Sequence, residues 1–113
     1  MPGLYPVPPE RNIIMTIEEK KEGETLTLIP NGNIDVHSSD EFTQTLIRSF
    51  QKSRALVVDM ESVAYVSSAG LRAFILGQKT ANSKGADLSL INVQDTVKDI
   101  FHTTGFDKLL KYS

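Results

Sequence analysis

The stretch ALVVDMESVAYVSSAGLRAF, residues 55–74, decides how this chain folds. Its first six residues, 55–60, form an apolar run with two valines, which predicts a strand buried on both faces at the centre of a partly parallel sheet. Its second half has helical spacing, with Leu71 and Phe74 on one side. A buried strand followed by an amphipathic helix is the repeating unit of α/β folds.

The residues before this stretch predict a hairpin and a helix. Alternating apolar residues predict two strands, over residues 13–19 and 25–30, joined by a glycine-containing turn. Ser38 and Glu41 match a capping box, in which the serine hydroxyl accepts a hydrogen bond from the helix backbone. The helix that they open has one apolar stripe and is expected to end near Lys52.

The residues after Ser68 predict a helix, a strand and a second helix. The first helix is expected over residues 69–83, with Gly85 at its C-terminal end, although Gly77 weakens it. Residues 86–92 predict the strand. The second helix is expected to have Asp95 as its N-cap and Gly105 as its C-cap, with Phe106 packing back on it.

The predicted order of elements is β-β-α-β-α-β-α, with a further short strand over residues 108–112. Strands that alternate with helices predict an α/β layer structure with a partly parallel sheet. The length of 113 residues suits one domain, which we place at residues 13–113. Residues 1–12 hold four of the five prolines and predict a flexible arm, because proline lacks a backbone donor.

Composition excludes several classes of function. The net charge of -2 gives no basic field for a nucleic-acid backbone. The chain has no cysteine, which excludes disulfides, thiolate catalysis and cysteine-based zinc sites. No apolar run approaches the roughly 20 residues of a membrane span, and no signal peptide is visible. We therefore expect a cytoplasmic protein that binds neither nucleic acid nor membrane.

Catalytic and metal-binding motifs are not found. His37 and His102 each lack a second ligand three or four residues away, so no metal is expected. The SSAG segment lacks the lysine of a phosphate-binding loop and the glycines that flank a hydrolase nucleophile. His37 is the only plausible base for a serine nucleophile. We therefore expect neither an enzyme nor a cofactor.

Two roles are possible for Ser67 and Ser68, and the two roles do not exclude each other. One serine is expected to be a helix N-cap. A helix start after a buried strand also lies at the carboxyl edge of the sheet, where a kinase could reach a hydroxyl. A phosphate would add roughly -1.5 to -2 charges and repel a docked protein. Asp35 lies close to Ser68 if their two loops share that edge, and is otherwise a solvated turn residue.

Three segments, GNIDVHSSDEF, ALVVDMESVAYVSSAGLRAF and VKDIFHTTGFDKLLKY, together resemble the bacterial anti-sigma factor antagonists, which are STAS-domain proteins. The resemblance runs from about Met15 to the C-terminus. It implies a single domain with a four- to five-stranded mixed sheet flanked by three to four helices. It also implies partner switching: the unphosphorylated antagonist binds an anti-sigma factor that is a serine-protein kinase, and the sigma factor is released. Phosphorylation by that kinase ends the complex, and a PP2C-type phosphatase resets the antagonist.

The resemblance also assigns roles to residues. Ser68 matches the phosphoacceptor, and Asp35 matches an aspartate beside it. Ser67 stands where some members carry an aspartate, so it is the alternative acceptor, and Ala69 replaces a serine or threonine of others. The residues expected to contact the partner are Ser67, Ala69, Gly70, Leu71, Arg72 and Ile75, although core packing is the favoured reading for Leu71 and Ile75.

A second hypothesis keeps the domain and changes its use. A stand-alone STAS domain could act as a scaffold, or sense a small ligand, in a signalling complex that is not linked to sigma release. Tight partner binding that ignores the charge at Ser68 would favour this second hypothesis.

Overall fold

The computed structural model describes residues 15–113, so the predicted arm over residues 1–12 lies outside the described residues. The predicted alternation of strands and helices is confirmed, including the last short strand. A 3-10 turn before that strand was not predicted; it follows Gly105, where the chain reverses. The elements are β1 (Thr16–Glu22), β2 (Thr25–Asn31), α1 (Ser39–Ser49), β3 (Ala55–Asp59), α2 (Ser68–Lys84), β4 (Asp87–Ile91), α3 (Asp95–Thr104), η2 (Phe106–Lys108) and β5 (Lys111–Tyr112).

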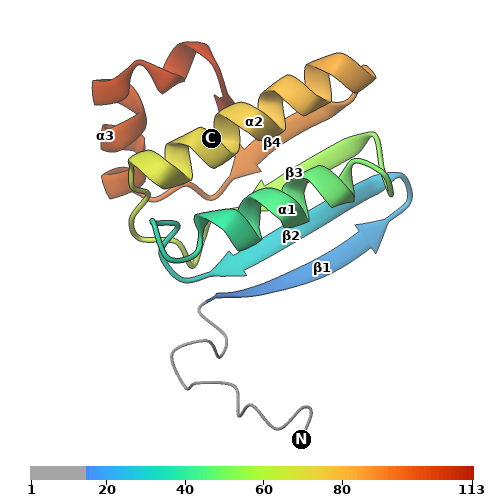
Figure 1. Ribbon diagram of the computed structural model, residues 1–113, viewed down its shortest axis with the longest axis horizontal. Coiled ribbons are helices and arrows are strands. Elements are labelled where there is room, and N and C mark those ends of the chain that lie inside the picture. The colour runs from blue at the N-terminus through green and yellow to red at the C-terminus, as the bar shows by residue number, and fades with distance from the viewer. Residues whose placement is uncertain (1–14) are drawn as a thin grey trace, which may run out of the picture.

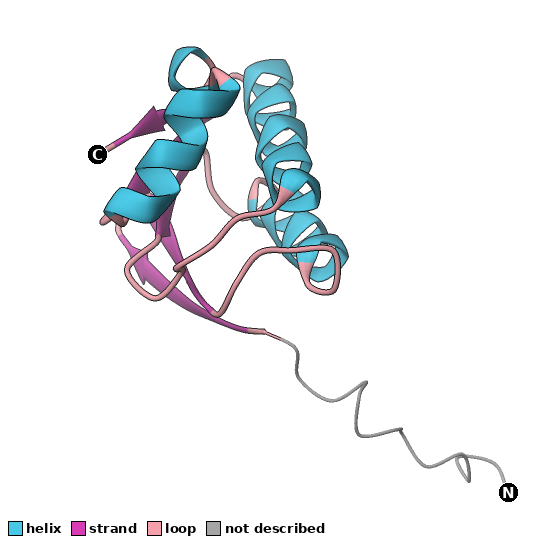
Figure 2. Cartoon of the chain, turned by 90° about the vertical axis from the view of Figure 1, so that its left-hand side faces the viewer, coloured by secondary structure: helices cyan, strands magenta, loops and turns pink. Residues whose placement is uncertain are grey.

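The strands form one five-stranded mixed sheet in the order β1-β2-β3-β4-β5. β1 and β2 are antiparallel, and every later neighbour is parallel. The helices lie on one side of this sheet, with α1 and α2 side by side in front of it in Figure 1. In the side view of Figure 2 the strands lie at the lower left and these two helices at the right. The predicted α/β fold with a mixed sheet is therefore confirmed.

The position of β3 is confirmed but its predicted burial is wrong. β3 is central and parallel to both neighbours. Leu56 and Val58 are 1% and 0% exposed, whereas Ala55, Val57 and Asp59 are only half-buried. Because the helices cover one face of the sheet, only alternate residues of β3 reach the core.

Aromatic side chains join the three helices over the sheet. Phe74 of α2 packs edge-on against Phe42 of α1, with ring centroids 5.2 Å apart, and against Phe101 of α3 at 6.1 Å. Gly77 lies on the buried side of α2, where a Cβ would sit 3.1 Å from Leu46 Cδ1 and 3.4 Å from Leu88 Cδ2. The glycine that weakens the helix also lets α2 approach α1 and the sheet closely.

Several predicted boundaries are corrected. Residues 13 and 14 of the predicted first strand lie outside the described residues. β1 runs from Thr16 to Glu22, three residues beyond the predicted end, because this exposed edge strand is mostly charged and lacks a clear apolar alternation. α1 ends at Ser49, earlier than predicted, with Phe50 as its C-cap. Gln94, one residue earlier than predicted, is the N-cap of α3, and Asp95 is the first helical residue.

The glycine ends of two helices are confirmed. Gly85 after α2 and Gly105 after α3 have left-handed backbones, with φ of 65° and 80°. Glycine takes this conformation without the steric cost of a Cβ. Phe106 then folds back as predicted and stacks on Phe101 with centroids 6.4 Å apart.

Beyond the ends of β2 and β3, the two chain segments pair once more. Ile34 and Val66 form an isolated parallel bridge. The Ile34 N–H donates to Tyr65 O at 3.1 Å, and the Ser67 N–H donates to Ile34 O at 2.9 Å. Gly70 packs on this bridge, because a Cβ there would lie 2.3 Å from Ile34 O. Only glycine fits at this contact.

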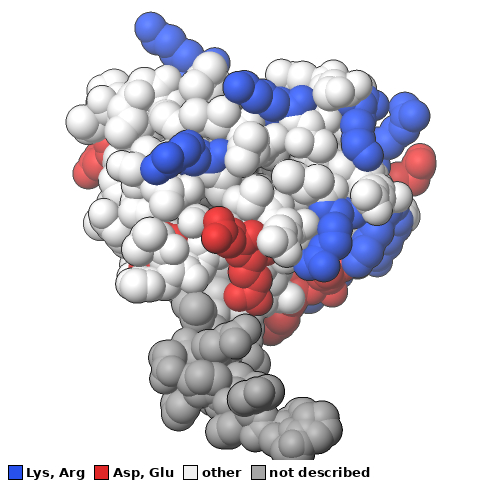
Figure 3. All heavy atoms as spheres, in the orientation of Figure 1, with Lys and Arg blue, Asp and Glu red and all other residues white. Residues whose placement is uncertain are grey.

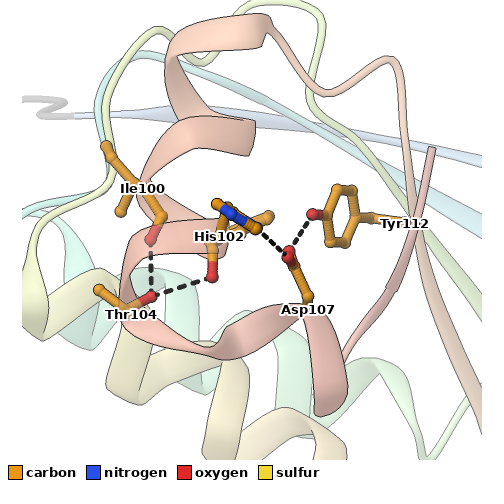
Figure 4. Close-up of polar contacts among 6 residues, drawn as sticks. Ile100, His102, Thr104, Asp107 and Tyr112 are labelled. Carbon is orange, nitrogen blue, oxygen red and sulfur yellow. Dashed lines mark hydrogen bonds and ion pairs between the residues drawn. The ribbon is translucent and has the colours of Figure 1, made fainter.

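A side-chain cluster joins the last three elements (Figure 4). Asp107 of η2 bonds to His102 Nδ1 of α3 at 2.8 Å and accepts a hydrogen bond from the Tyr112 hydroxyl of β5. The bond from Tyr112, followed by that from His102, lowers the pKa of Asp107. The bond to Asp107 raises the pKa of Tyr112.

We predict that Gly70→Ala lowers the free energy of unfolding by roughly 2–4 kcal/mol in urea titrations, because the added methyl group overlaps backbone and side-chain atoms. Gly85→Ala is the matched control. Nothing lies within 4 Å of a Cβ at Gly85, so only the backbone strain of about 1–2 kcal/mol is expected. Equal losses in the two variants would contradict the close packing at Gly70.

We predict that the stabilisation provided by Tyr112 disappears in alkali. Its pKa is higher in the folded chain than the usual value of 10.0, so the unfolded chain loses the phenolic proton first as pH rises. The stabilisation is complete below about pH 10 and declines as the pH passes through the folded pKa. Denaturant unfolding of the wild type and Tyr112→Phe at several pH values measures it.

The difference between wild type and Tyr112→Phe should stay constant between about pH 6 and 9 and shrink above about pH 10. Because Asp107 has a lowered pKa, its own contribution is present above about pH 4 and is lost as the pH falls through the folded value. A difference that stays constant through pH 11 would show that Tyr112 and Asp107 are not bonded in solution.

Candidate functional site

The candidate site lies at the carboxyl edge of the parallel strands. The loop after β2 contains Asp35, and the loop after β3 leads to Ser67 and Ser68. The bridge between Ile34 and Val66 pairs these loops. Asp35 and Ser67 each follow a bridged residue directly, so the structure brings the two predicted segments together at one edge of the sheet.

The two serines at the start of α2 differ in their surroundings. Ser67 is half-buried and is the N-cap, with its Oγ accepting a hydrogen bond from the Gly70 N–H at 3.4 Å. Ser68 is the first residue of the helix, and its side chain is exposed. The cap therefore uses Ser67, and the hydroxyl of Ser68 faces solvent.

Asp35 is held in an ordered turn. One carboxylate oxygen, Oδ1, accepts a hydrogen bond from the His37 N–H at 2.9 Å. Its backbone oxygen accepts from the Ser38 and Ser39 N–H groups at 3.1 and 2.8 Å. Asp35 is half-buried, and it directly follows Ile34, whose backbone pairs with the segment that leads into α2.

Ser38 has a different role from the predicted one. It is the residue before α1, but its side chain makes no capping bond, so the predicted capping box is wrong. The buried hydroxyl donates to Asn33 O at 2.7 Å and accepts from the Asp35 N–H at 3.1 Å. Its φ and ψ of -113° and -11° are near-helical, unlike the extended backbone of a capping residue. Ser38 closes the turn that holds Asp35.

Three large apolar side chains are exposed on the two loops of the site and on α2. Val36, Tyr65 and Leu76 are 71%, 49% and 47% exposed. They come from the Asp35 loop, the loop before Ser67 and the third turn of α2. A groove of about 350 Å³ runs between α1 and α2, and it is lined by Val36, Ser39, Asp40, Thr43, Ala69, Arg72, Ala73 and Leu76. Neighbouring apolar groups that remain exposed favour a protein-docking surface.

The partner-contact residues predicted from sequence fall into two groups. Arg72 is exposed, and Ala69 and Ile75 are half-buried. Gly70 and Leu71 are buried, so their side chains lie in the packed interior. Sequence reasoning missed Val36 and Tyr65, because an apolar residue in a loop carries no periodic signal. Leu76 lies off the buried stripe of α2, which was a usable signal.

Charge is unevenly distributed over the molecule. Lys and Arg side chains gather over the β1–β2 turn and the C-terminal ends of α1 and α2, at the right of Figure 3. The carboxyl edge of the strands instead carries several acids. These are Asp35, Asp40, Glu41, Asp59, Glu61 and Asp95. A negative group added at Ser68 therefore enters a region that already carries negative charge.

Residues 15–113 contain neither a metal-binding cluster nor a membrane-spanning helix. Across residues 15–113, no three His, Cys, Asp or Glu side chains come close enough to hold a metal ion. In the same part of the chain, the helices are too short or too polar to cross a membrane.

Relatives match nearly the full length of the described residues. A STAS-domain containing protein of Pseudomonas aeruginosa is 28% identical over 92 residues, which are 81% of this chain and 91% of that protein. The anti-sigma-B factor antagonist of Staphylococcus aureus is 27% identical over 97 residues, which are 85% of this chain and 90% of the relative.

Solved structures share the fold. A proposed anti-sigma factor antagonist of Thermotoga maritima has a TM-score of 0.79 and 16% identity, over 85% of this chain and 84% of that one. The Bacillus cell fate determinant SpoIIAA in its phosphorylated form has a TM-score of 0.66 and 15% identity, over 87% and 91% of the two chains. These likenesses confirm the expected fold.

The family model with the description STAS domain matches residues 16–113. The match spans all the described strands and helices, from β1 to β5. The chain belongs to the STAS domain family.

Proposed function

We propose that the chain is an anti-sigma factor antagonist that works by partner switching. Unphosphorylated, it binds an anti-sigma factor that is a serine-protein kinase, and the sigma factor is released. The kinase transfers the γ-phosphoryl group of ATP to Ser68 Oγ: the new P–O bond forms, the bond to ADP breaks, and the hydroxyl proton passes to a base of the kinase. A PP2C-type phosphatase hydrolyses the phosphate and resets the chain.

The exposed hydroxyl of Ser68 is the observation that carries this proposal. Ser68 opens α2 without serving as its cap, so a phosphate there leaves the Ser67 cap intact. The start of a helix tolerates negative charge. The likeness to the Staphylococcus aureus antagonist and to a SpoIIAA structure in phosphorylated form supports the same assignment.

Release of the partner after phosphorylation follows from the side chains that a docked partner must cover. The exposed groups Val36, Tyr65 and Leu76 gain free energy only if water leaves them. A phosphate beside them would either be desolvated, which is costly, or keep the partner away. It also adds roughly -1.5 to -2 charges beside the carboxylates of the same edge. The switch therefore acts through the surface and needs no refolding.

The alternative is a STAS scaffold or ligand-sensing domain without a link to sigma release. A second groove, of about 520 Å³, favours it. This groove lies between α2 and the C-terminal segment, and it is lined by Ile75, Gln78, Lys79, Asn82, Lys108, Leu109 and Leu110. It is separate from the groove beside Ser68, so a small ligand there would leave the phosphorylation surface free.

We predict that Ser68→Ala abolishes phosphorylation and preserves partner binding. The chain is incubated with ATP and the serine kinases encoded beside its gene, and phosphate is located by mass spectrometry. Ser67→Ala is the matched control, and it should still be phosphorylated while losing about 1 kcal/mol of helix-cap stability. Persistent labelling of Ser68→Ala at Ser67 would reverse the assignment of the two serines.

Phosphorylated chain, purified from the same reaction, should bind the kinase at least about tenfold more weakly than the unphosphorylated chain, through like-charge repulsion and desolvation. Calorimetric titration of both forms measures this difference. Equal affinities would refute partner switching and favour the scaffold reading.

We predict that Asp35→Asn slows phosphorylation of Ser68 and changes the free energy of unfolding by less than about 1 kcal/mol. Asparagine keeps the side-chain oxygen that accepts from the His37 N–H and removes only the charge. The control is Glu22→Gln, which changes an exposed carboxylate at the end of β1 that is remote from the site. Identical phosphorylation rates for Asp35→Asn and wild type would remove Asp35 from the site.

A further inference from the structure

Arg72 lies one helical turn beyond Ser68 on the same side of α2. The two residues are four positions apart, and both side chains are exposed. Residues at this spacing are neighbours on a helix surface, with about 5–6 Å between their Cβ atoms. Helical side chains also lean toward the N-terminus, so the long side chain of Arg72 extends over the turn that begins with Ser68.

The guanidinium of Arg72 is free within the described residues. The three ion pairs of residues 15–113 join Lys52 to Glu19, His102 to Asp107 and Lys111 to Asp87. α2 itself contains no acidic residue, so no carboxylate on its own helix competes for Arg72. Asp40 lines the same groove, but it does not form an ion pair with Arg72.

We infer that Arg72 is the partner of a phosphate on Ser68, and that phosphorylation thereby withdraws this cation from the docking groove. The inference rests on the proposed function, which places the phosphate at Ser68. The planar guanidinium can donate two parallel hydrogen bonds to phosphate oxygens. Before phosphorylation, the same group lines the groove with Val36 and Leu76 and is available to a carboxylate of the docked protein.

On α2, Arg72 is the cation nearest to Ser68. The charged groups near the carboxyl ends of the strands are His37, Lys98 of α3 and the carboxylates of Asp35, Asp40, Glu41, Asp59, Glu61 and Asp95. The carboxylates oppose a phosphate, and Lys98 lies on a different helix, so Lys98→Met is a further control in the titration described below. Lys79, the next cation of α2, lies eleven positions beyond Ser68, about 16 Å along the helix axis.

The test uses the full chain with phosphoserine incorporated at position 68 during translation, so it needs no kinase. A phosphorus NMR titration measures the second pKa of the phosphate. Arg72→Met should raise this pKa by about 0.3–0.7 units, the range expected for an exposed ion pair. Arg72→Lys should keep most of the wild-type value, and Lys79→Met should leave it unchanged.

A second readout follows Arg72 itself. Its side-chain Nε–H resonance should shift during the same titration with the midpoint of the phosphate, and the shift should weaken at high salt. The inference would be overturned by a phosphate pKa that is the same in wild type and Arg72→Met. It would also be overturned if the chemical shift of the Arg72 Nε–H did not change during the titration.

The outcomes separate this inference from the proposed function. A pKa that depends on Arg72, together with kinase binding that ignores the phosphate, would uphold the pairing and refute partner switching. A phosphate that expels the kinase equally well in wild type and Arg72→Met, with no change in pKa, would refute the pairing and leave partner switching intact.

Discussion

Two backbone hydrogen bonds around Ile34 hold the candidate site together. They extend the parallel pairing of β2 and β3 beyond the strand ends, and both bridged side chains are buried, with Ile34 0% and Val66 1% exposed. Buried backbone groups that lose such partners cost about 1–3 kcal/mol each. Gly70 lets the first turn of α2 rest on this bridge. The relative positions of Asp35 and Ser68 follow from this single contact.

Three serines at this edge have different structural roles. Ser38 is buried and closes the Asp35 turn, and Ser67 caps α2. Both hydroxyls are committed to backbone groups, so removing either one weakens the frame of the site. Ser68 follows Ser67 as the first residue of α2 and is not the residue that caps this helix. A hydroxyl in this position can change its charge while the frame beneath it keeps its hydrogen bonds.

Much of the fold was predictable because its signals are local. Left-handed glycines ended α2 and α3 as the sequence indicated, and the strands alternated with helices as predicted. The errors concern the exact ends of elements and the burial or bonding of single side chains, which local patterns do not determine. An apolar run cannot distinguish one buried face from two, so β3 was assigned too much burial. Ser38 satisfied a local capping pattern, but its hydroxyl bonds to a loop that folds back on it.

Sequence patterns could predict which segments meet at the candidate site, but not the surface that they form. The VSSAGL motif and Asp35 were expected to share one edge of the sheet, and the bridge between Ile34 and Val66 brings their loops together there. Which serine is the cap depends on a helix boundary defined to one residue, beyond what sequence patterns resolve. The exposed surface that includes Val36 and Tyr65 exists only because the fold brings the two loops together, so no local sequence pattern indicates it. Gly70, predicted as a contact, is buried, and Leu71 is buried as the favoured prediction of core packing had it.

We propose that phosphorylation changes the surface charge of a rigid site and leaves the fold unchanged. Amide hydrogen exchange of the chain with and without phosphoserine at position 68 distinguishes a change of surface charge from a change of fold. Protection should be equal throughout the sheet and the buried turns of α2, with differences confined to the first turn of α2 and the Asp35 loop. Loss of protection at Ile34 and Ser67, or along β3, would mean instead that the phosphate breaks the bridge and rearranges the site.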